Sequence, residues 1–347
     1  RDALRHKLPD TALAISKQLL RETNSVFADR LLRLNVLQEA RNAEFKPALA
    51  EFRREAAQGT NAQAKIYELA MWQMARTGPK ETLTWLQSLP RATQTNQPVT
   101  VLIANCQIFA QDWTNLLATL DPQNWGELEF LRHALKARGL RGRELTDSAK
   151  AEWEQALKTA GNNAGSLVML LRLAALWKWQ TEGEDLLWLI VNRYPNEKWA
   201  ATALSQVLYR SGRTRSLLTL FSQQAKQFSA DLSAKNNLAM TALLLEANEL
   251  KPHDLAREVY QKAPTNSAYV STYAFSLHLQ KKDAEALKLM QQLKPKDLEA
   301  PSIAGYYGLI LKAAGDKEKA KVYLQWAAKA PMLPEEKKLF DRAASGG

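Results

Sequence analysis

Small and apolar residues recur at a fixed interval in the C-terminal part of the chain. Between residues 268 and 331, two stretches align without a gap at a spacing of 34 residues. In each stretch, the apolar positions follow helical spacing in two runs separated by a turn. Six residues of the first stretch, Val270, Ala274, Leu277, Ala286, Met290 and Leu293, fall on Ala304, Gly308, Leu311, Ala320, Leu324 and Ala327 of the second. A period of this size predicts a stack of antiparallel helix hairpins.

The second copy carries the packing and turn signals most clearly. Gly308 would let the two helices of a hairpin approach closely. Gly315 suits the left-handed backbone that ends many helices, and Asp316 suits the N-cap of the next one. Pro331 stands beyond the second helix, where it would prevent continuation. This pattern resembles a tetratricopeptide repeat, and the resemblance implies an all-α, right-handed superhelical solenoid of antiparallel hairpins.

The same register extends toward the N-terminus. Leu204, Ser205 and Leu208 lie 34 residues after Leu170, Leu171 and Ala174. The copy that contains Ala239 is lengthened between Leu245 and Asp254. Earlier still, the consensus residues fade, but helical periods persist. These periods predict helices over 11–20, 27–41, 47–57, 62–77, 80–89, 99–110 and 113–120.

We therefore expect nine or ten hairpins, counting half repeats at the ends. Residues 1–120 would form irregular tetratricopeptide-like hairpins, and residues 121–347 a more regular array. A helix over 335–344, with Leu339 and Phe340 inward, would cap this array. Three glycines within 121–148 suggest a bend in one continuous solenoid. The first 22 residues resemble the tail of a hairpin, so we expect an upstream partner segment in a longer protein.

The formal charge of +11 permits anionic partners. Most basic residues alternate with acidic ones, which is typical of a solvated surface. Two clusters are more strongly basic and could bind an anion: Arg132, Lys136, Arg138, Arg141 and Arg143, and then Arg193, Lys198, Arg210, Arg213 and Arg215. Cys106, the single cysteine, lies on an apolar helical run and suggests a small buried side chain. The richest apolar window, 166–179, is interrupted by charges and too short for a membrane span.

The first helix of each hairpin in such an array lines the concave face. We expect a partner-binding surface there, made of amide, aromatic and guanidinium groups: Arg172, Trp199, Gln206, Tyr209, Arg210, Asn236, Asn237 and His278. The Asn236–Ala239 run is similar to runs in peptide-binding tetratricopeptide grooves, where an asparagine pairs with the peptide backbone. Asn236 could instead hydrogen-bond between repeats. Trp199 is the tryptophan that we expect to be exposed in the groove.

Catalytic and cofactor signatures are missing from the sequence. The four histidines are isolated from one another and from Cys106. A metal-ligand spacing such as His-Glu-x-x-His, a phosphate-binding glycine loop and a Gly-x-Ser-x-Gly nucleophile elbow are all absent. We therefore expect neither an enzyme nor a protein that holds a metal or cofactor.

A non-catalytic scaffold that binds a protein or peptide partner is the leading hypothesis. Electrostatic nucleic-acid binding is one alternative, although no recurring base-reading side chains appear at equivalent slots. A purely architectural or oligomerisation module is the other. The loose repeats favour a bacterial source, and both the cytoplasm and a tethered extracytoplasmic position fit the residues.

Overall fold

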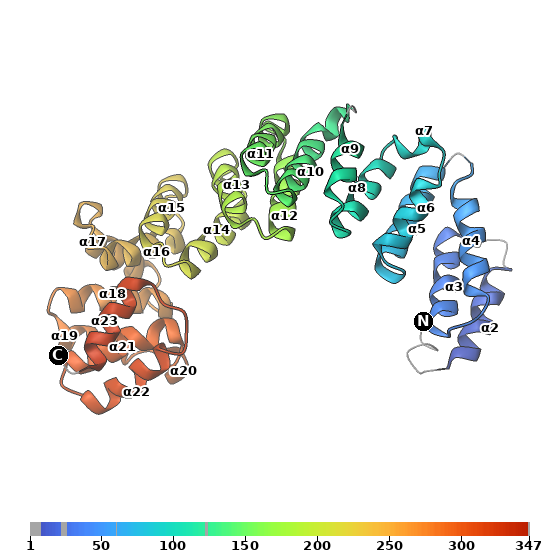
Figure 1. Cartoon of the computed structure of the whole chain (residues 1–347). Coiled ribbons are helices and arrows are strands. Elements are labelled where there is room, and N and C mark those ends of the chain that lie inside the picture. The colour runs from blue at the N-terminus through green and yellow to red at the C-terminus, as the bar shows by residue number, and fades with distance from the viewer. Residues whose placement is uncertain (1–7, 22–25, 60, 122–123, 346–347) are drawn as a thin grey trace. The chain divides into compact units, whose positions relative to one another are not determined.

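The computed structural model describes residues 8–21, 26–59, 61–121 and 124–345. All regular secondary structure in these ranges is helical (Figure 1). The chain divides into two compact units, residues 1–170 and 171–347. The boundary falls inside α12 (Ala164–Leu176). This division follows contact density, whereas the boundary predicted at residue 120 follows the regularity of the repeat, and that boundary stays a prediction.

The first unit is built from helices that follow one another closely along the chain. Its elements are α2 (Pro9–Leu19), α3 (Phe27–Glu39), α4 (Phe45–Ala56), α5 (Ala62–Arg76), α6 (Pro79–Gln87), α7 (Arg91–Gln94), α8 (Val99–Phe109), α9 (Trp113–Leu120), η1 (Gly126–Leu128), α10 (Glu129–Gly142) and α11 (Thr146–Ala160). The seven helices predicted up to residue 120 are confirmed within a few residues. The short α7 was missed, because four residues are too few to display a period.

The second unit continues the pattern. After α12 come α13 (Gln180–Arg193), α14 (Lys198–Arg210), α15 (Thr214–Gln227), α16 (Leu232–Leu244), η2 (Asn248–Leu250), α17 (Pro252–Lys262), α18 (Ser267–Leu279), α19 (Asp283–Met290), α20 (Pro295–Leu298), α21 (Pro301–Ala313), α22 (Lys317–Ala327) and α23 (Pro334–Ala344). The extra residues predicted after Leu245 form η2. The predicted C-terminal helix is α23, with Phe340 buried and Leu339 partly buried.

The long helices from α3 to α22 form nine hairpins in the described part of the chain, as the period predicts. Each hairpin turn holds a residue with left-handed backbone two residues after the first helix ends. These residues are Arg41, Gly78, Gln111, Glu144, Lys178, Gly212, Glu246, Lys281 and Gly315. In eight turns, the following residue donates its backbone N–H to a carbonyl five residues back, as Asp316 does to Leu311. This is the Schellman arrangement, which satisfies carbonyls at a helix end.

The recurring turn shows that the N-terminal hairpins are copies of the same unit. Six of the nine left-handed positions hold a side chain instead of the glycine that the period leads one to expect. Asparagine and glycine are the usual residues there, so arginine, glutamine, glutamate and lysine concealed these turns in the sequence. The repeat is therefore more regular in backbone than in residue type. The chain is a tetratricopeptide-like helical repeat protein.

Glycines allow two helix pairs to pack more closely than side chains would permit. A Cβ atom on Gly308 of α21 would lie 3.0 Å from the Ala320 carbonyl oxygen and 2.9 Å from Leu324 Cγ in α22. A Cβ atom on Gly142 of α10 would lie 2.4 Å from the Trp113 ring in α9. The close contact predicted at Gly308 is confirmed. The glycines of 129–142 lie inside a helix and serve packing.

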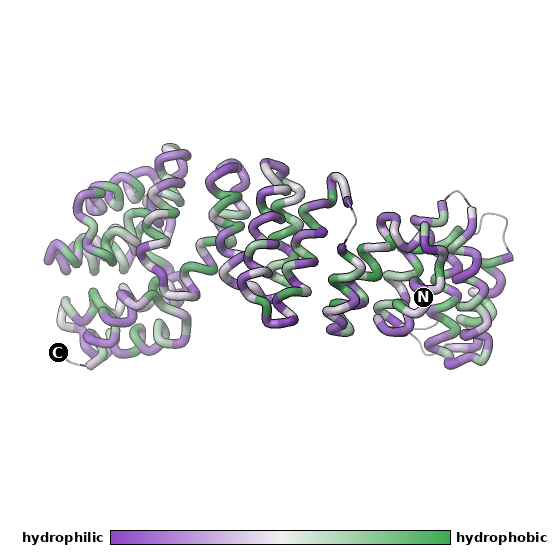
Figure 2. The backbone as a smooth tube through the Cα atoms, turned by 45° about the horizontal axis from the view of Figure 1, so that its top comes forward, coloured by the Kyte–Doolittle hydropathy of each residue, from purple (hydrophilic) through white to green (hydrophobic). Residues whose placement is uncertain are grey.

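Apolar side chains fill each unit separately. The first unit has a core that includes Leu34, Phe52, Leu69, Trp85 and Cys106. The second has a core around Val270, Met290, Ile303, Ile310 and Ala320. Figure 2 shows apolar and polar residues alternating along the helices instead of forming separate blocks. This alternation is what amphipathic helices produce when they bury one face each.

Candidate functional site

The candidate site is organised along α14. Ala200, Ala201, Leu204 and Leu208 are buried at helical spacing, so one face of α14 is packed. The opposite face carries polar side chains. Consecutive first helices approach each other closely at α16–α18 and at α18–α21, but α14 and α16 do not. Space therefore opens beside α14.

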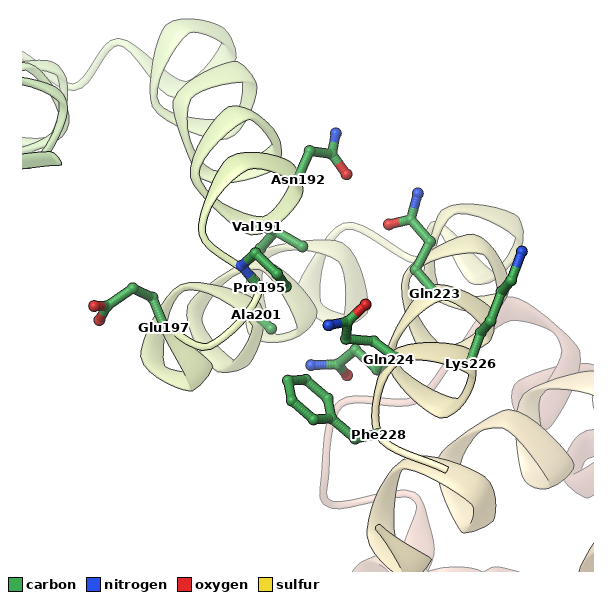
Figure 3. A pocket seen from close by; sticks show the side chains of 10 residues that line it. Val191, Asn192, Pro195, Glu197, Ala201, Gln223, Gln224, Lys226 and Phe228 are labelled. Carbon is green, nitrogen blue, oxygen red and sulfur yellow. The ribbon is translucent and has the colours of Figure 1, made fainter. Parts of the chain in front are cut away.

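One recess beside α14 has a volume of about 430 Å³. It lies between the end of α13, the loop at Pro195, the start of α14 and the end of α15. Figure 3 shows Gln224 and Phe228 of the α15 end facing Pro195 and Ala201, while Gln223 and Lys226 extend at the rim. Its lining combines an apolar floor with amide groups.

Two further recesses continue this one along α14. One of about 230 Å³ shares Ala201, Gln224 and Phe228 with the first and adds Asn237 of α16. Another of about 290 Å³ shares Ser205 and Phe221 with the second, and is lined by Gln206, Tyr209, Arg210, Leu217 and Pro331. Because neighbouring recesses share lining residues, they form one continuous surface. We call this surface, made of the three recesses, the α14 groove.

Four of the eight residues expected at a partner surface line the α14 groove: Gln206, Tyr209, Arg210 and Asn237. Asn237 is partly exposed, so its amide can reach a ligand. The Tyr209 hydroxyl donates to the Pro331 carbonyl oxygen at 3.2 Å and to Glu336 Oε2 at 3.1 Å. Burial and the nearby Glu336 carboxylate raise the pKa of Tyr209, so it remains a hydrogen-bond donor at neutral pH.

The other four expected residues lie outside the α14 groove. Asn236 is only 7% exposed, and its Oδ1 has no hydrogen-bond partner. Trp199 is 42% exposed but does not line the α14 groove, and its indole nitrogen donates to Glu197 at 2.8 Å. Arg172 is exposed on α12. His278 Nδ1 lies 2.5 Å from Asp283 Oδ1 across its hairpin turn, so this ring nitrogen is engaged within its own hairpin.

The sequence did not identify the residues that line the α14 groove from α15. Phe228 follows the last residue of α15, and Gln224 lies one turn before it. Sequence reasoning assigned ligand-facing roles to first helices, whereas these side chains come from a second helix. Their exposure depends on the spacing between α14 and α16, which no local pattern encodes.

One basic side chain beside the α14 groove has an acidic partner, and another has none among the described residues. Lys198 lies 3.6 Å from Asp231 and stacks over the Phe228 ring at 5.3 Å. Asp231 also caps α16 through the backbone N–H groups of Ser233 and Ala234. Arg210 is exposed and makes no ion pair with any residue that the structure describes. A guanidinium group is therefore available to a ligand at one end of the groove.

Two residues of the basic cluster at α10, Arg132 and Lys136, are paired with acidic neighbours. Arg132 pairs with Glu129, and Lys136 lies 3.0 Å from Glu152. The hydrogen bond from Arg132 lowers the pKa of Glu129. Burial works to raise the pKa of Glu152, but hydrogen bonds with His133 and Lys136 outweigh it. This network stabilises the α10–α11 hairpin and leaves less positive charge for an anion.

Within the described ranges, no group of three or more histidine, cysteine, aspartate or glutamate residues is arranged to hold a metal ion. None of the described helices combines the length and apolarity needed to span a bilayer.

Comparisons with known proteins found a similarity among solved structures only. It matches no family model, and no curated protein is similar to it in sequence. Among solved structures, it is similar to a tetratricopeptide repeat protein from Parabacteroides merdae ATCC 43184. The identity is 12%, the alignment covers 71% of this chain and 96% of that chain, and the TM-score is 0.37. The assignment to a tetratricopeptide-like fold therefore rests on the nine hairpins and their common turn.

Proposed function

We propose that this chain is a non-catalytic scaffold that binds a segment of a protein partner in the α14 groove. The observation that carries the proposal is the continuity of the three recesses along one helix. Ligand sites are typically concave, with an apolar floor and a few polar groups that fix orientation. Phe221 and Phe228 supply the floor, and Asn237 and Arg210 supply polar groups.

The dimensions of the groove fit an extended peptide. The 13 residues of α14 span about 20 Å at the rise of an α-helix. An extended chain of about six residues covers that length. Asparagine and glutamine side chains both donate and accept hydrogen bonds, so they can pair with the backbone of such a segment.

Affinity capture with the full chain as bait tests this function. We expect the parent to capture a protein that Arg210→Ala combined with Asn237→Ala captures at least tenfold less, because two polar contacts are lost. Arg91→Ala is the matched control, since Arg91 is exposed on α7 in the other unit. It should capture the same amount as the parent.

Two salt concentrations separate the alternatives. Capture that the double variant loses at both concentrations supports the groove. Capture of nucleic acid that disappears as salt rises would favour electrostatic binding, because such binding depends steeply on salt. The absence of any specific capture would contradict the proposal and favour an architectural module.

A further inference from the structure

The C-terminal segment of the chain forms part of the wall at one end of the α14 groove. After α22 ends at Ala327, the chain runs without a helix to Pro334, where α23 begins. Pro331 lines the recess that contains Gln206 and Arg210. Residues 331–336 thus contact α14 and α15, more than 100 residues earlier in the sequence. We call residues 331–336 the clasp.

Two adjacent carboxylates hold the clasp in place. Glu336 is 8% exposed and accepts hydrogen bonds from the hydroxyls of Tyr209 and Tyr306, at 3.1 and 2.6 Å. It also accepts the backbone N–H of Leu333 at 2.8 Å. The neighbouring Glu335 accepts the hydroxyl hydrogen of Thr214. A buried carboxylate needs such donors to offset the loss of water, so these contacts are specific for an acidic group.

The backbone of the hairpin turn is shaped to admit the clasp. Gly212 has left-handed backbone, and a Cβ atom there would lie 3.1 Å from Pro334 Cγ. A side chain at this position would press against the clasp. The junction of α14 and α15 therefore offers hydroxyl donors and a side-chain-free turn to a segment with a proline and adjacent carboxylates.

The remainder of α23 makes further contacts with α21. Phe340 packs edge-on against Tyr306 at 5.2 Å and over Gly305, where a Cβ atom would lie 2.4 Å from its ring. The Lys312 ammonium group donates to the Ala343 carbonyl oxygen at 2.6 Å. Residues 331–336 can thus leave α14 while Phe340 stays bound to α21.

We propose that the junction of α14 and α15 is a binding site for a segment that presents two adjacent carboxylates at the start of a helix, that the clasp fills it in the free chain, and that the protein partner displaces the clasp. This inference rests on the proposed function of the α14 groove. A tethered segment competes at an effective concentration in the millimolar range, so the clasp would select against weak acidic ligands.

Thiol labelling in the full chain tests whether the clasp opens locally. Thr214→Cys places a thiol under the clasp, and Thr241→Cys places one at a similarly buried site on α16; these threonines are 3% and 4% exposed. The natural Cys106 is fully buried, and burial raises its pKa to about 11, so it should react slowly. Replacing both Glu335 and Glu336 by glutamine should raise the labelling rate at residue 214 about tenfold and leave residue 241 unchanged. An equal rise in the labelling rate at both sites, or no rise at either site, would contradict local opening of the clasp.

A peptide added in trans tests the ligand chemistry. The probe is a fluorescein-labelled synthetic peptide of residues 328–338, followed by anisotropy. It should bind the Glu335→Gln, Glu336→Gln chain at least tenfold more tightly than the parent, whose clasp competes. The same peptide with both glutamates replaced by glutamine should lose this binding. Equal binding of the two peptides, equal binding to the two chains, or no binding to the opened chain would overturn the inference. The capture experiment with Arg210 and Asn237 variants judges the proposed function separately.

Discussion

At the scale of residues, many charged side chains form ion pairs and hydrogen bonds that stabilise the fold. Glu129 illustrates this role, because it accepts hydrogen bonds from Arg132 and from the backbone N–H of Trp125. The sequence placed Arg132 and Lys136 in a cluster that could bind an anion, since a pattern of residues does not show which carboxylates reach them. The same limit applies to the site: Asn236 and Asn237 are neighbours, yet only Asn237 lines the groove.

A pH-dependent stability difference follows from Glu129. Its pKa in the folded chain lies below the ordinary value of 4.5, so its ion pair stabilises the fold above about pH 4.5 and is lost as the pH falls below that value. Glu129→Gln should therefore lower the free energy of unfolding by less than about 1 kcal/mol at pH 7, after allowance for solvent screening. The difference should shrink toward pH 3.5. Urea unfolding at both pH values measures it, with the exposed neighbour Glu127→Gln as control. A difference that is constant with pH would contradict the assigned ion pair.

At the scale of elements, the hairpin is the unit that the sequence predicted best. Apolar periods located the long helices even in the N-terminal third, because a buried stripe must repeat every turn. The lengthened turn after Leu245 was also located, since it interrupts the 34-residue register. The left-handed turn residues were not predicted where the residue is not glycine. The backbone hydrogen bonds that recur in these turns identify them in the structure. The open space between α14 and α16 escaped as well, because it depends on how two hairpins meet.

The common turn predicts opposite effects for a matched pair of substitutions. Lys281→Gly should raise the free energy of unfolding by up to about 1 kcal/mol, because glycine adopts left-handed backbone without strain. Gly315→Ala should lower it by about 1 kcal/mol, because Gly315 has a φ of +94°, which strains a residue with a side chain even though no atom lies within 4 Å of where its Cβ would stand. Denaturant titration of each variant measures both effects. Shifts of the same sign would show that the two turns are not equivalent.

At the scale of the whole molecule, the repeat plan explains the architecture but does not select a partner. Within each unit, the hairpins pack mainly on their neighbours in sequence, which is the nearest-neighbour logic of helical repeat proteins. The clasp departs from this logic, because residues 331–336 contact a hairpin that lies several repeats earlier. Such a long-range contact is invisible to a periodic pattern. The candidate site therefore lies where the regular stacking of hairpins is interrupted, at α14 and the clasp that contacts it.

Site-specific photocrosslinking tests the central claim most directly. The full chain would carry a photoreactive benzoyl-phenylalanine in place of Gln206 in the α14 groove, or in place of Arg91 on α7 as control. We predict that a protein from an extract of the source organism crosslinks at residue 206 and not at residue 91. The Asn237→Ala substitution should reduce this crosslink. Equal crosslinking at both residues, or a crosslink at residue 206 that Asn237→Ala leaves unchanged, would contradict the assignment of the α14 groove as the partner site.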